Sequence, residues 1–409
     1  YAAMPEGAKP LCKPRVLVIG GTQFMGRATV AALLQNGGYD LTILNRGRTE
    51  SPFEGLVRHI ACDRRKRALG AFIASEPAWH AVIDFVAFGP DDVRRIVPQH
   101  VDKLGLYILI STDSVYMASS ATGFVRGPNG RLTEQSDAQP DAARAALDEY
   151  GANKRDLEHL LAQHGRCSGL RCVCLRLPDV LGRHENTGRQ HALIKRLVGG
   201  RPIGTAVEAG GDGGFGRALP LSFAFAEDVA AALVAAVAAA ADADAGAALV
   251  GATLHVCSDE APTWAEFVTR LAAELRAQGA PTMHACALPP LPCLDSGATP
   301  YQPPCTRTRT RTCPHVLTYA PTRSLTVSRA GVPVPPVRLD EARDTRFVSV
   351  DCGALDNGAA SRLLPGYAPA PLAQRLRETV AWWLEEQRVA FELGEAGEAG
   401  EAGEAGEAG

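Results

Sequence analysis

The stretch VLVIGGTQFMGR, residues Val16–Arg27, decides how the first part of this chain folds. The apolar run Arg15–Gly20 predicts a buried β-strand, and Gly26–Asn36 predicts the helix that follows it. A strand, a glycine-rich turn and a helix in this order are typical of a unit that binds phosphate groups. Unpaired amides at the start of the helix would face the anion.

The glycines of this turn match what a bound dinucleotide requires. Gly20 permits the tight turn, Gly21 lets the backbone approach a pyrophosphate, and Gly26 lets the helix pack close to the sheet. The stretch therefore predicts a dinucleotide site. We expect its contacts from Gly20, Gly21, Thr22, Gln23, Phe24, Met25 and Gly26, and from Val86 and Ala87 after a later strand.

The rest of the first 260 residues alternates short β-rich runs with helical stretches. This alternation predicts an α/β fold in which helices flank a doubly wound parallel sheet of the Rossmann type, spanning residues 13–260. Further strands are expected at Leu41–Asn45, Val57–Cys62, Ala81–Val86, Tyr107–Ser111 and Cys172–Leu177, a helix at Glu149–His164, and a strand end passing into an Ala-rich helix across Phe223–Ala240.

Two regions depart from this rhythm. Gln278–Pro336 is rich in Pro, Cys and Thr, and its composition predicts a poorly ordered insertion. The three arginines of Thr306–Thr312 fit a solvated loop better than a phosphate contact, because no aromatic residues accompany them. From Gly394 the chain repeats GEA, which predicts a flexible acidic tail over residues 394–409. Before it, Ala370–Gln387 predicts an amphipathic helix carrying two tryptophans.

Composition excludes several classes of protein. The 42 basic residues balance 45 acidic ones, so no global charge favours nucleic acid or an anionic membrane. The longest apolar run, Val229–Ala241, is well short of the ~20 residues that a bilayer span needs. Eleven cysteines without CxxC pairs or zinc-like spacing predict no metal site and a reducing, cytoplasmic-type compartment. An organelle address preceding Tyr1 would change the second expectation.

The end of the second strand bears on the choice between NAD and NADP. An acidic residue about 20 positions after the turn would bind the ribose hydroxyls of NAD. Here that position holds Asn45, followed by Arg46 and Arg48. Since no carboxylate repels a 2′-phosphate and a guanidinium can pair with it, the sequence favours NADP over NAD; the alternative is a solvated basic turn. Asp63, after the third strand, either meets the adenine or caps the basic segment that follows.

A candidate catalytic set lies further along the chain. Tyr150 and Lys154 are four residues apart on an expected helix, so both side chains project from one face. A nearby ammonium and a positive nicotinamide would lower the pKa of the tyrosine from its ordinary ~10 towards neutrality. Upstream, Ile108–Tyr116 places hydroxyls and a carboxylate at a strand end, where open α/β sheets bind ligands. Thr112 would hydrogen-bond the substrate oxygen that gains or loses a proton.

Together these motifs resemble the extended short-chain dehydrogenase/reductases, specifically the NAD-dependent epimerase/dehydratase family, over about residues 15–277 and 346–387. LRLPDVLGR at Leu175–Arg183 is similar to the family's RPxxVYGP stretch, and FAFAEDVAAAL at Phe223–Leu233 to its HVDDVA segment. GGTxFxGR and LNRG resemble a subgroup of sugar-nucleotide epimerase homologues. The resemblance implies a smaller C-terminal substrate lobe, expected at 261–390 with contributions from 184–220. Gln23 departs from it, because the family usually has glycine there; a side chain is tolerable if its backbone dihedrals are ordinary.

The resemblance implies Thr112 as the catalytic Ser/Thr, Tyr150 as acid/base and Lys154 as its partner and as a ribose contact. Asp113 occupies the position of a dehydratase acid, but Ser114 replaces the glutamate that follows it in sugar-dehydrating members. That replacement argues against sugar dehydration. Arg183 or Arg217 would clamp a substrate phosphate, unless both are ordinary surface arginines.

The sequence thus predicts reversible hydride transfer at a carbinol carbon of a sugar-like, nucleotide-linked substrate, with NADP or NAD as cofactor. It does not choose among epimerase, dehydratase and reductase. The alternative is a non-catalytic NAD(P)-binding regulator or an RNA-binding relative of the epimerases. Thr112, Tyr150 and Lys154 argue for catalysis, since a binding module has no need of an activated phenol. The family also implies a homodimer.

Overall fold

The computed structural model describes residues 13–66, 68–200, 220–280 and 353–404, with side chains described as far as residue 388. Its centre is a seven-stranded parallel sheet in the order β3-β2-β1-β4-β5-β6-β9. The strands are β1 Arg15–Ile19, β2 Asp40–Asn45, β3 Arg58–Ala61, β4 Ala81–Asp84, β5 Leu106–Thr112, β6 Arg171–Leu177 and β9 Thr253–His255. This order confirms the expected Rossmann fold.

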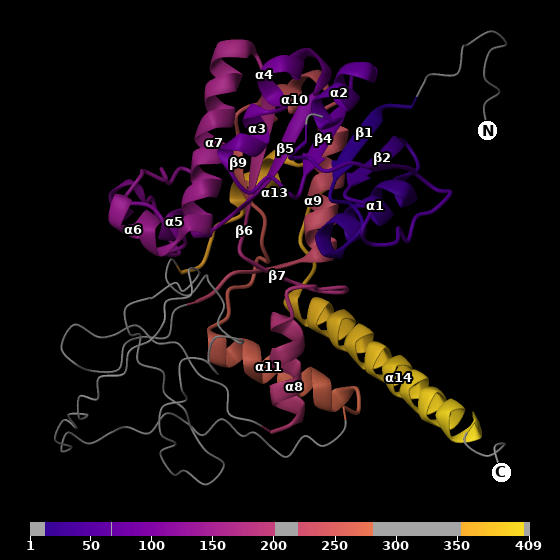
Figure 1. Ribbon diagram of the computed structural model, residues 1–409. Coiled ribbons are helices and arrows are strands. Elements are labelled where there is room, and N and C mark those ends of the chain that lie inside the picture. Colours follow the sequence, from indigo (N-terminus) through magenta and orange to yellow (C-terminus); the bar gives the residue numbers. More distant parts are fainter. Residues whose placement is uncertain (1–12, 67, 201–219, 281–352, 405–409) are drawn as a thin grey trace, which may run out of the picture.

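Helices cover both faces of the sheet (Figure 1). One face packs against α1 (Phe24–Asn36), α9 (Ala226–Ala239), α10 (Ala243–Leu249) and α13 (Gly358–Leu363). The other packs against α2 (Ala68–Ser75), α3 (Pro90–Arg94), α4 (Val97–His100) and α7 (Glu149–Ser168). The central strands of the sheet are apolar on both faces because helices bury both faces of the sheet. The strand order reverses between β1 and β4, so their carboxyl ends flank the crevice where such sheets bind ligands.

A second apolar cluster lies beyond the carboxyl edge of the sheet. It joins α8 (Arg189–Val198), α11 (Trp264–Ala277) and α14 (Leu372–Glu404) with the small parallel pair β7 (Asp179–Leu181) and β8 (Phe223–Phe225). Phe223 stacks on Phe267 with ring centroids 4.1 Å apart. Figure 1 shows α8, α11 and α14 grouped on one side of the sheet body.

The segment 353–367 departs from the expected C-terminal lobe. Ala359, Ala360, Leu364 and Tyr367 are buried in the core on the α9 face of the sheet. Asp356 accepts a hydrogen bond from His255 of β9 through its carbonyl oxygen, at 2.8 Å. After the expected insertion the chain therefore packs on the Rossmann core before it reaches α14.

The low-complexity regions are described only in part. Most of the expected insertion 278–336 and Arg217 lie outside the described residues. Helix α14 continues through Gly394 to Glu404, where the GEA repeat predicted a flexible tail. Ala and Glu favour helix and extend one already begun, although each glycine opposes it. No helix in the described part of the chain is long and apolar enough to cross a membrane.

Short helices complete the carboxyl edge. They are α5 (Ser114–Met117), α6 (Ala142–Leu147) and the 3₁₀ turn Ala121–Gly123; a further 3₁₀ turn, Val101–Lys103, precedes β5. Helix α5 begins directly after β5, and α6 directly precedes α7. Both therefore lie beside the residues that the sequence places in the candidate catalytic set.

Candidate active site

The glycine-rich turn after β1 requires two of its glycines for steric reasons. Gly20 has φ +99°, in the left-handed region, and a Cβ on it would lie 2.9 Å from Val86 Cγ1. A Cβ on Gly26 would collide with the carbonyl oxygen of Gly20. The start of α1 therefore packs directly on the turn, as expected.

The backbone conformation in the middle of the turn accommodates Gln23, where the family usually has glycine. Gln23 is extended, with φ −130° and ψ 153°, so a side chain there is compatible with the turn. The next residue, Phe24, instead has φ +42°, which favours glycine. Such a conformation costs about 1–3 kcal/mol. Burial of the Phe24 ring, which is 6% exposed, offsets this cost. No pattern in the sequence signalled the backbone strain at this residue.

Gly21 is also required for packing. A Cβ built on it would lie 2.9 Å from Val30 Cγ2 and 3.1 Å from Val18 Cγ1. The position of the missing side chain thus points into the apolar core, and glycine is needed there for helix–sheet packing. The close approach of its backbone to a bound pyrophosphate stays a prediction.

The turn fits a dinucleotide pyrophosphate. Helix α1 has no side chain capping its N-terminus and no acidic residue in its first turn. Its first amides are the groups that bind phosphate oxygens at helix N-termini. Val86 and Ala87 follow β4, on the other side of the switch point, and Val86 lies against Gly20. Thr22 and Ala87 are buried.

Asn45 organises the end of β2, where the sequence predicts the ribose of the cofactor. Its Nδ2 donates to Thr22 Oγ1 at 3.0 Å, and its Oδ1 accepts from the Gly47 amide at 2.7 Å. Arg46 and Arg48 are exposed, so a guanidinium is accessible beside Asn45. Asp63 Oδ1 accepts from the Arg65 amide at 3.0 Å. Asp63 thus caps a turn, because α2 begins only at residue 68.

The candidate catalytic residues come together at the carboxyl ends of β5 and β6. Thr112 is the last residue of β5, and the Asp113 amide donates to the Leu177 carbonyl at the end of β6, at 2.9 Å. Tyr150 lies in the first turn of α7, where Asp148 accepts from the Gly151 amide at 2.9 Å. The Tyr150 phenol lies close enough to the Thr112 hydroxyl for the two groups to interact.

The environment of Tyr150 opposes ionisation of its phenol. Burial, and then the charge of Asp113, raise the pKa of Tyr150 to about 12; the interaction with Thr112 and the charge of Arg189 act in the opposite direction. The residue as a whole is 44% exposed. Without cofactor, burial and the Asp113 carboxylate dominate the pKa of Tyr150. The predicted lowering by Lys154 together with a bound nicotinamide stays a prediction.

Lys154 is buried beneath the site. Only 2% of it is exposed, and its Nζ donates to the Ile110 carbonyl of β5 at 2.6 Å. The ammonium lies 5.1 Å from the centroid of the Phe88 ring and 5.9 Å from that of Tyr150. Burial lowers the pKa of Lys154 to about 8, against the charges of Asp84, Glu158 and Asp92. Lys154 thus contacts the strand backbone and the two rings.

Arg189 is a site residue that sequence reasoning missed. It begins α8, pairs with the buried Asp179 at 2.7 Å, and its charge reaches the Tyr150 phenol. Arg183, one of the two expected phosphate clamps, is exposed and pairs with Glu227 at 2.8 Å. Nothing in the local sequence distinguishes Arg189 from other surface arginines. Only the packing of α8 on β7 places it at the site.

A buried polar network supports β5 from behind. Ser111 Oγ donates to Glu158 Oε1 at 2.5 Å, and Arg176 forms an ion pair with Glu158 at 2.6 Å. Arg176 also donates to the Tyr116 hydroxyl at 2.6 Å. Each partner satisfies the other's hydrogen bonds, so the network holds β5, β6 and α7 in register next to Thr112. Within the described ranges, no group of three or more His, Cys, Asp or Glu could hold a metal ion.

Comparison with known families agrees with this geometry. The model of the NAD-dependent epimerase/dehydratase family matches residues 16–251. The chain belongs to this family. A UDP-glucose 4-epimerase of Azospirillum brasilense is 28% identical over 201 residues, which are 45% of this chain and 55% of that enzyme. The match thus spans about half the length of this curated member of the family.

Solved structures of epimerases and dehydratases share the fold. A putative epimerase from Burkholderia cenocepacia J2315 is 15% identical, with TM-score 0.56, over 90% of this chain and 98% of its own. UDP-N-acetylglucosamine 4-epimerase from Methanobrevibacter ruminantium M1, in complex with UDP-N-acetylmuramic acid, is 15% identical, with TM-score 0.57, over 92% of this chain and 100% of its own. At these identities the likeness establishes the architecture of the family.

Proposed function

We propose that this protein is an NAD(P)-dependent oxidoreductase or epimerase acting at a carbinol carbon of a sugar-like, nucleotide-linked substrate. The proximity of Thr112 and Tyr150 supports this most directly, because it puts two hydroxyls at the carboxyl edge of β5, two strands from the glycine-rich turn. Family membership over residues 16–251 supports the class of reaction.

Tyr150 and Thr112 would both act on the proton of the substrate hydroxyl. Tyr150 would exchange it with the substrate hydroxyl, and Thr112 would hold the substrate oxygen by a second hydrogen bond. The raised pKa keeps Tyr150 protonated near pH 7, which suits it to donate to a carbonyl oxygen. The bound nicotinamide cofactor would supply the hydride chemistry and add a positive charge in its oxidised form. With Lys154, that charge would favour the phenolate for the opposite direction.

Arg189 would recognise an anionic part of the substrate. Its side chain is 44% exposed, and Asp179 holds it between the end of β6 and the start of β7. Arginine binds phosphate and carboxylate groups through paired N–H donors. We therefore assign the expected phosphate clamp to Arg189 in place of Arg183.

Loss of the Tyr150 hydroxyl tests the proposed reaction. Tyr150→Phe is expected to lower turnover about 10²–10⁴-fold while the affinity for cofactor is retained. The assay would follow epimerised or oxidised products from a panel of UDP- and dTDP-sugars. Tyr39→Phe, at the amino end of β2, is a matched control that should not change turnover.

The nucleotide that the purified protein retains distinguishes epimerisation from dehydrogenation or reduction. Mass spectrometry of the purified protein identifies any nucleotide that co-elutes. A retained cofactor would favour epimerisation, which returns the hydride within one active site; its absence would favour dehydrogenation or reduction. If the protein binds cofactor but neither wild type nor Tyr150→Phe turns over any sugar nucleotide, it is a non-catalytic regulator and the proposal is wrong.

We further propose that the protein prefers NADP. Asn45 carries no negative charge at the ribose end, and Arg46 is exposed beside it. Calorimetry should show that wild type binds NADP about tenfold more tightly than NAD, a difference worth about 1.4 kcal/mol. Asn45→Asp should reverse this order, because a carboxylate repels the 2′-phosphate and accepts from the ribose hydroxyls. Equal affinities of the wild type for both nucleotides would exclude the preference.

A further inference from the structure

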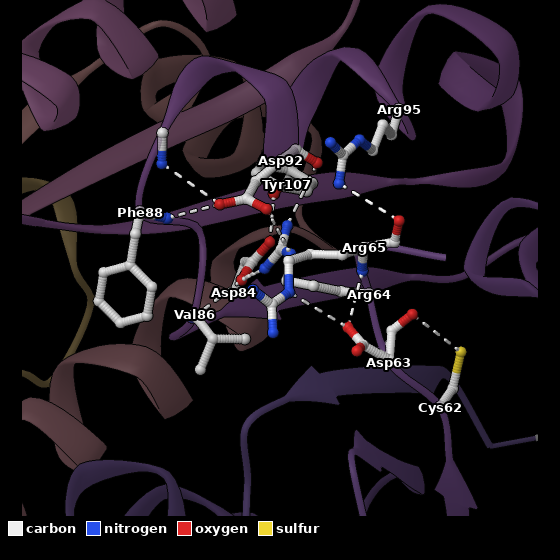
Figure 2. Close-up of polar contacts among 11 residues, drawn as sticks. Cys62, Asp63, Arg64, Arg65, Asp84, Val86, Phe88, Asp92, Arg95 and Tyr107 are labelled. Atoms are coloured by element: carbon white, nitrogen blue, oxygen red, sulfur yellow. Dashed lines mark hydrogen bonds and ion pairs between the residues drawn. The ribbon is translucent and has the colours of Figure 1, made fainter. Parts of the chain in front are cut away.

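Three charged side chains form a buried cluster that the proposed reaction does not use (Figure 2). Arg64 follows β3, Asp84 ends β4 and Asp92 lies in α3. Arg64 Nη1 is 2.6 Å from Asp84 Oδ1, and its Nε is 3.2 Å from Asp92 Oδ1. Their side chains are 9%, 0% and 16% exposed. Two carboxylates against one guanidinium leave one net negative charge.

The two carboxylates also shape the loop between β4 and α3. Asp84 Oδ1 accepts from the Val86 amide at 3.0 Å. Asp92 Oδ2 accepts from the amides of Phe88 and Gly89, at 2.9 and 3.2 Å. Figure 2 shows Arg64 lying between these carboxylates. The loop that carries Val86 and Phe88 is therefore held by the same groups that hold Arg64.

Cluster and loop both reach Lys154. β4 pairs with β5 so that Asp84 lies opposite Leu109, and Lys154 donates to the next carbonyl, that of Ile110. The Phe88 ring lies 5.1 Å from the ammonium. A buried ammonium requires opposite charge nearby. The neighbouring charges are Asp84, Asp92 and Glu158, which favour the ammonium, and Arg64, which opposes it.

We propose that Asp84 and Asp92, anchored by Arg64, supply the counter-charge of Lys154 and hold Phe88 over its ammonium. Arg64 and Asp84 are then positioning residues for the candidate active site, a description that rests on the proposed function. The coupling of charges does not depend on it. Since Arg64 directly follows Asp63, the cluster also links the expected adenine end of the cofactor site to the lysine.

Direct titration of Lys154 tests the cluster. The chain contains only six lysines, so ¹³C-lysine labelling gives few Cε signals, and Lys154→Met identifies the one that belongs to Lys154. Asp84→Asn should lower the midpoint of this titration by about one pH unit, and Arg64→Met should raise it by about one unit, because nearby charges of opposite sign act in opposite directions. Arg64→Lys keeps the charge and should leave the midpoint within a few tenths of a unit of wild type.

Two further variants keep the test decisive. Arg58→Met removes an arginine that pairs with Glu76 at the amino end of β3, and it should not shift the Lys154 midpoint. If Asp84→Asn does not fold, Asp92→Asn replaces it, with a smaller downward shift expected. No shift, or shifts in one direction for both the Asp and the Arg64→Met variants, would overturn the proposal. The measurement uses neither substrate nor cofactor, so its outcome is independent of whether the protein catalyses hydride transfer.

Discussion

His255 shows how a single side chain is constrained by its partners. Its Nδ1 lies 2.8 Å from the carbonyl oxygen of Asp356, which can only accept, so Nδ1 carries the proton. Nε2 must then accept from the Tyr116 hydroxyl, 2.6 Å away. Tyr116 in turn accepts from Arg176. Every group in this buried chain has its partner only if the imidazole is neutral.

Acid should therefore destabilise the protein through His255. Burial, and then the charge of Arg176, lower the pKa of His255 to about 3 from 6.5. Between these values the unfolded state binds more protons than the folded state, so the free energy of unfolding falls as pH falls. Lowering the pH from 6.5 to 4.5 should cost about 2–3 kcal/mol at 1.36 kcal/mol per unit.

Urea unfolding at several pH values measures this effect. His255→Gln keeps one donor and one acceptor but does not titrate, and should lack the loss of stability above pH 4.5. His159→Gln, on the exposed face of α7, should behave as wild type. If wild type and His255→Gln lose stability in parallel, the neutral imidazole does not control acid stability.

Some single residues of the site were predictable and others were not. Thr112, Tyr150 and Lys154 belong to short motifs whose spacing carries chemical meaning, and the structure brings them together. Arg64 and Arg189 are arginines without a local motif. Arg64 is important because it pairs with a carboxylate that is distant in the sequence. Arg189 is important because it pairs with a carboxylate on another element. No pattern within a few residues of either could have revealed them.

At the scale of elements, helix α7 is positioned by its first turn. Asp148 caps the helix, and Gly151 lets it approach α5 so closely that a Cβ would collide with the Ser114 carbonyl and lie 2.8 Å from Asp148 Oδ2. Tyr150 lies next to this glycine. The distance between Tyr150 and Thr112 therefore depends on the absence of one side chain.

Gly151→Ala should separate α7 from α5. Overpacking of this kind costs about 1–3 kcal/mol, and displacement of Tyr150 should reduce turnover by more than the loss of stability explains. The matched control is Gly165→Ala in the same helix, where a Cβ would meet the Leu170 carbonyl at an ordinary 3.4 Å. Since alanine favours helix, that variant should gain about 0.5–1 kcal/mol. Thermal unfolding compares the two, and equal stabilities would contradict the role of Gly151.

Element types were the most predictable part of the fold. Strands such as β1 and β5 are short apolar runs, and the expected helices show apolar periodicity or an Ala-rich run, so local composition suffices for these elements. The glycine-rich turn shows where local reasoning fails. Gln23 meets the condition of ordinary backbone dihedrals, but neither the strain at Phe24 nor the core contact of Gly21 follows from a motif.

At the scale of the whole molecule, contacts between distant segments complete the fold. His255 binds the backbone of Asp356, and Arg375 of α14 pairs with the buried Asp228 of α9 at 2.6 Å. These contacts hold the segments that follow the expected insertion against the sheet and its helices. The apolar pattern of 353–367 does not say which surface it covers, because many apolar surfaces would accept it.

Local pattern alone was enough to predict the parallel sheet, the glycine-rich turn and the candidate set Thr112, Tyr150 and Lys154. These features depend on periodicity, backbone conformation and spacing, which act over a few residues. The charges around the site were decided by the folded arrangement. Asp113 and burial raise the pKa of Tyr150, and Lys154 lies beside a carboxylate cluster anchored by Arg64. Electrostatic effects depend on distance through space and on exclusion of water, and both arise only when strands and helices from separate parts of the chain pack together.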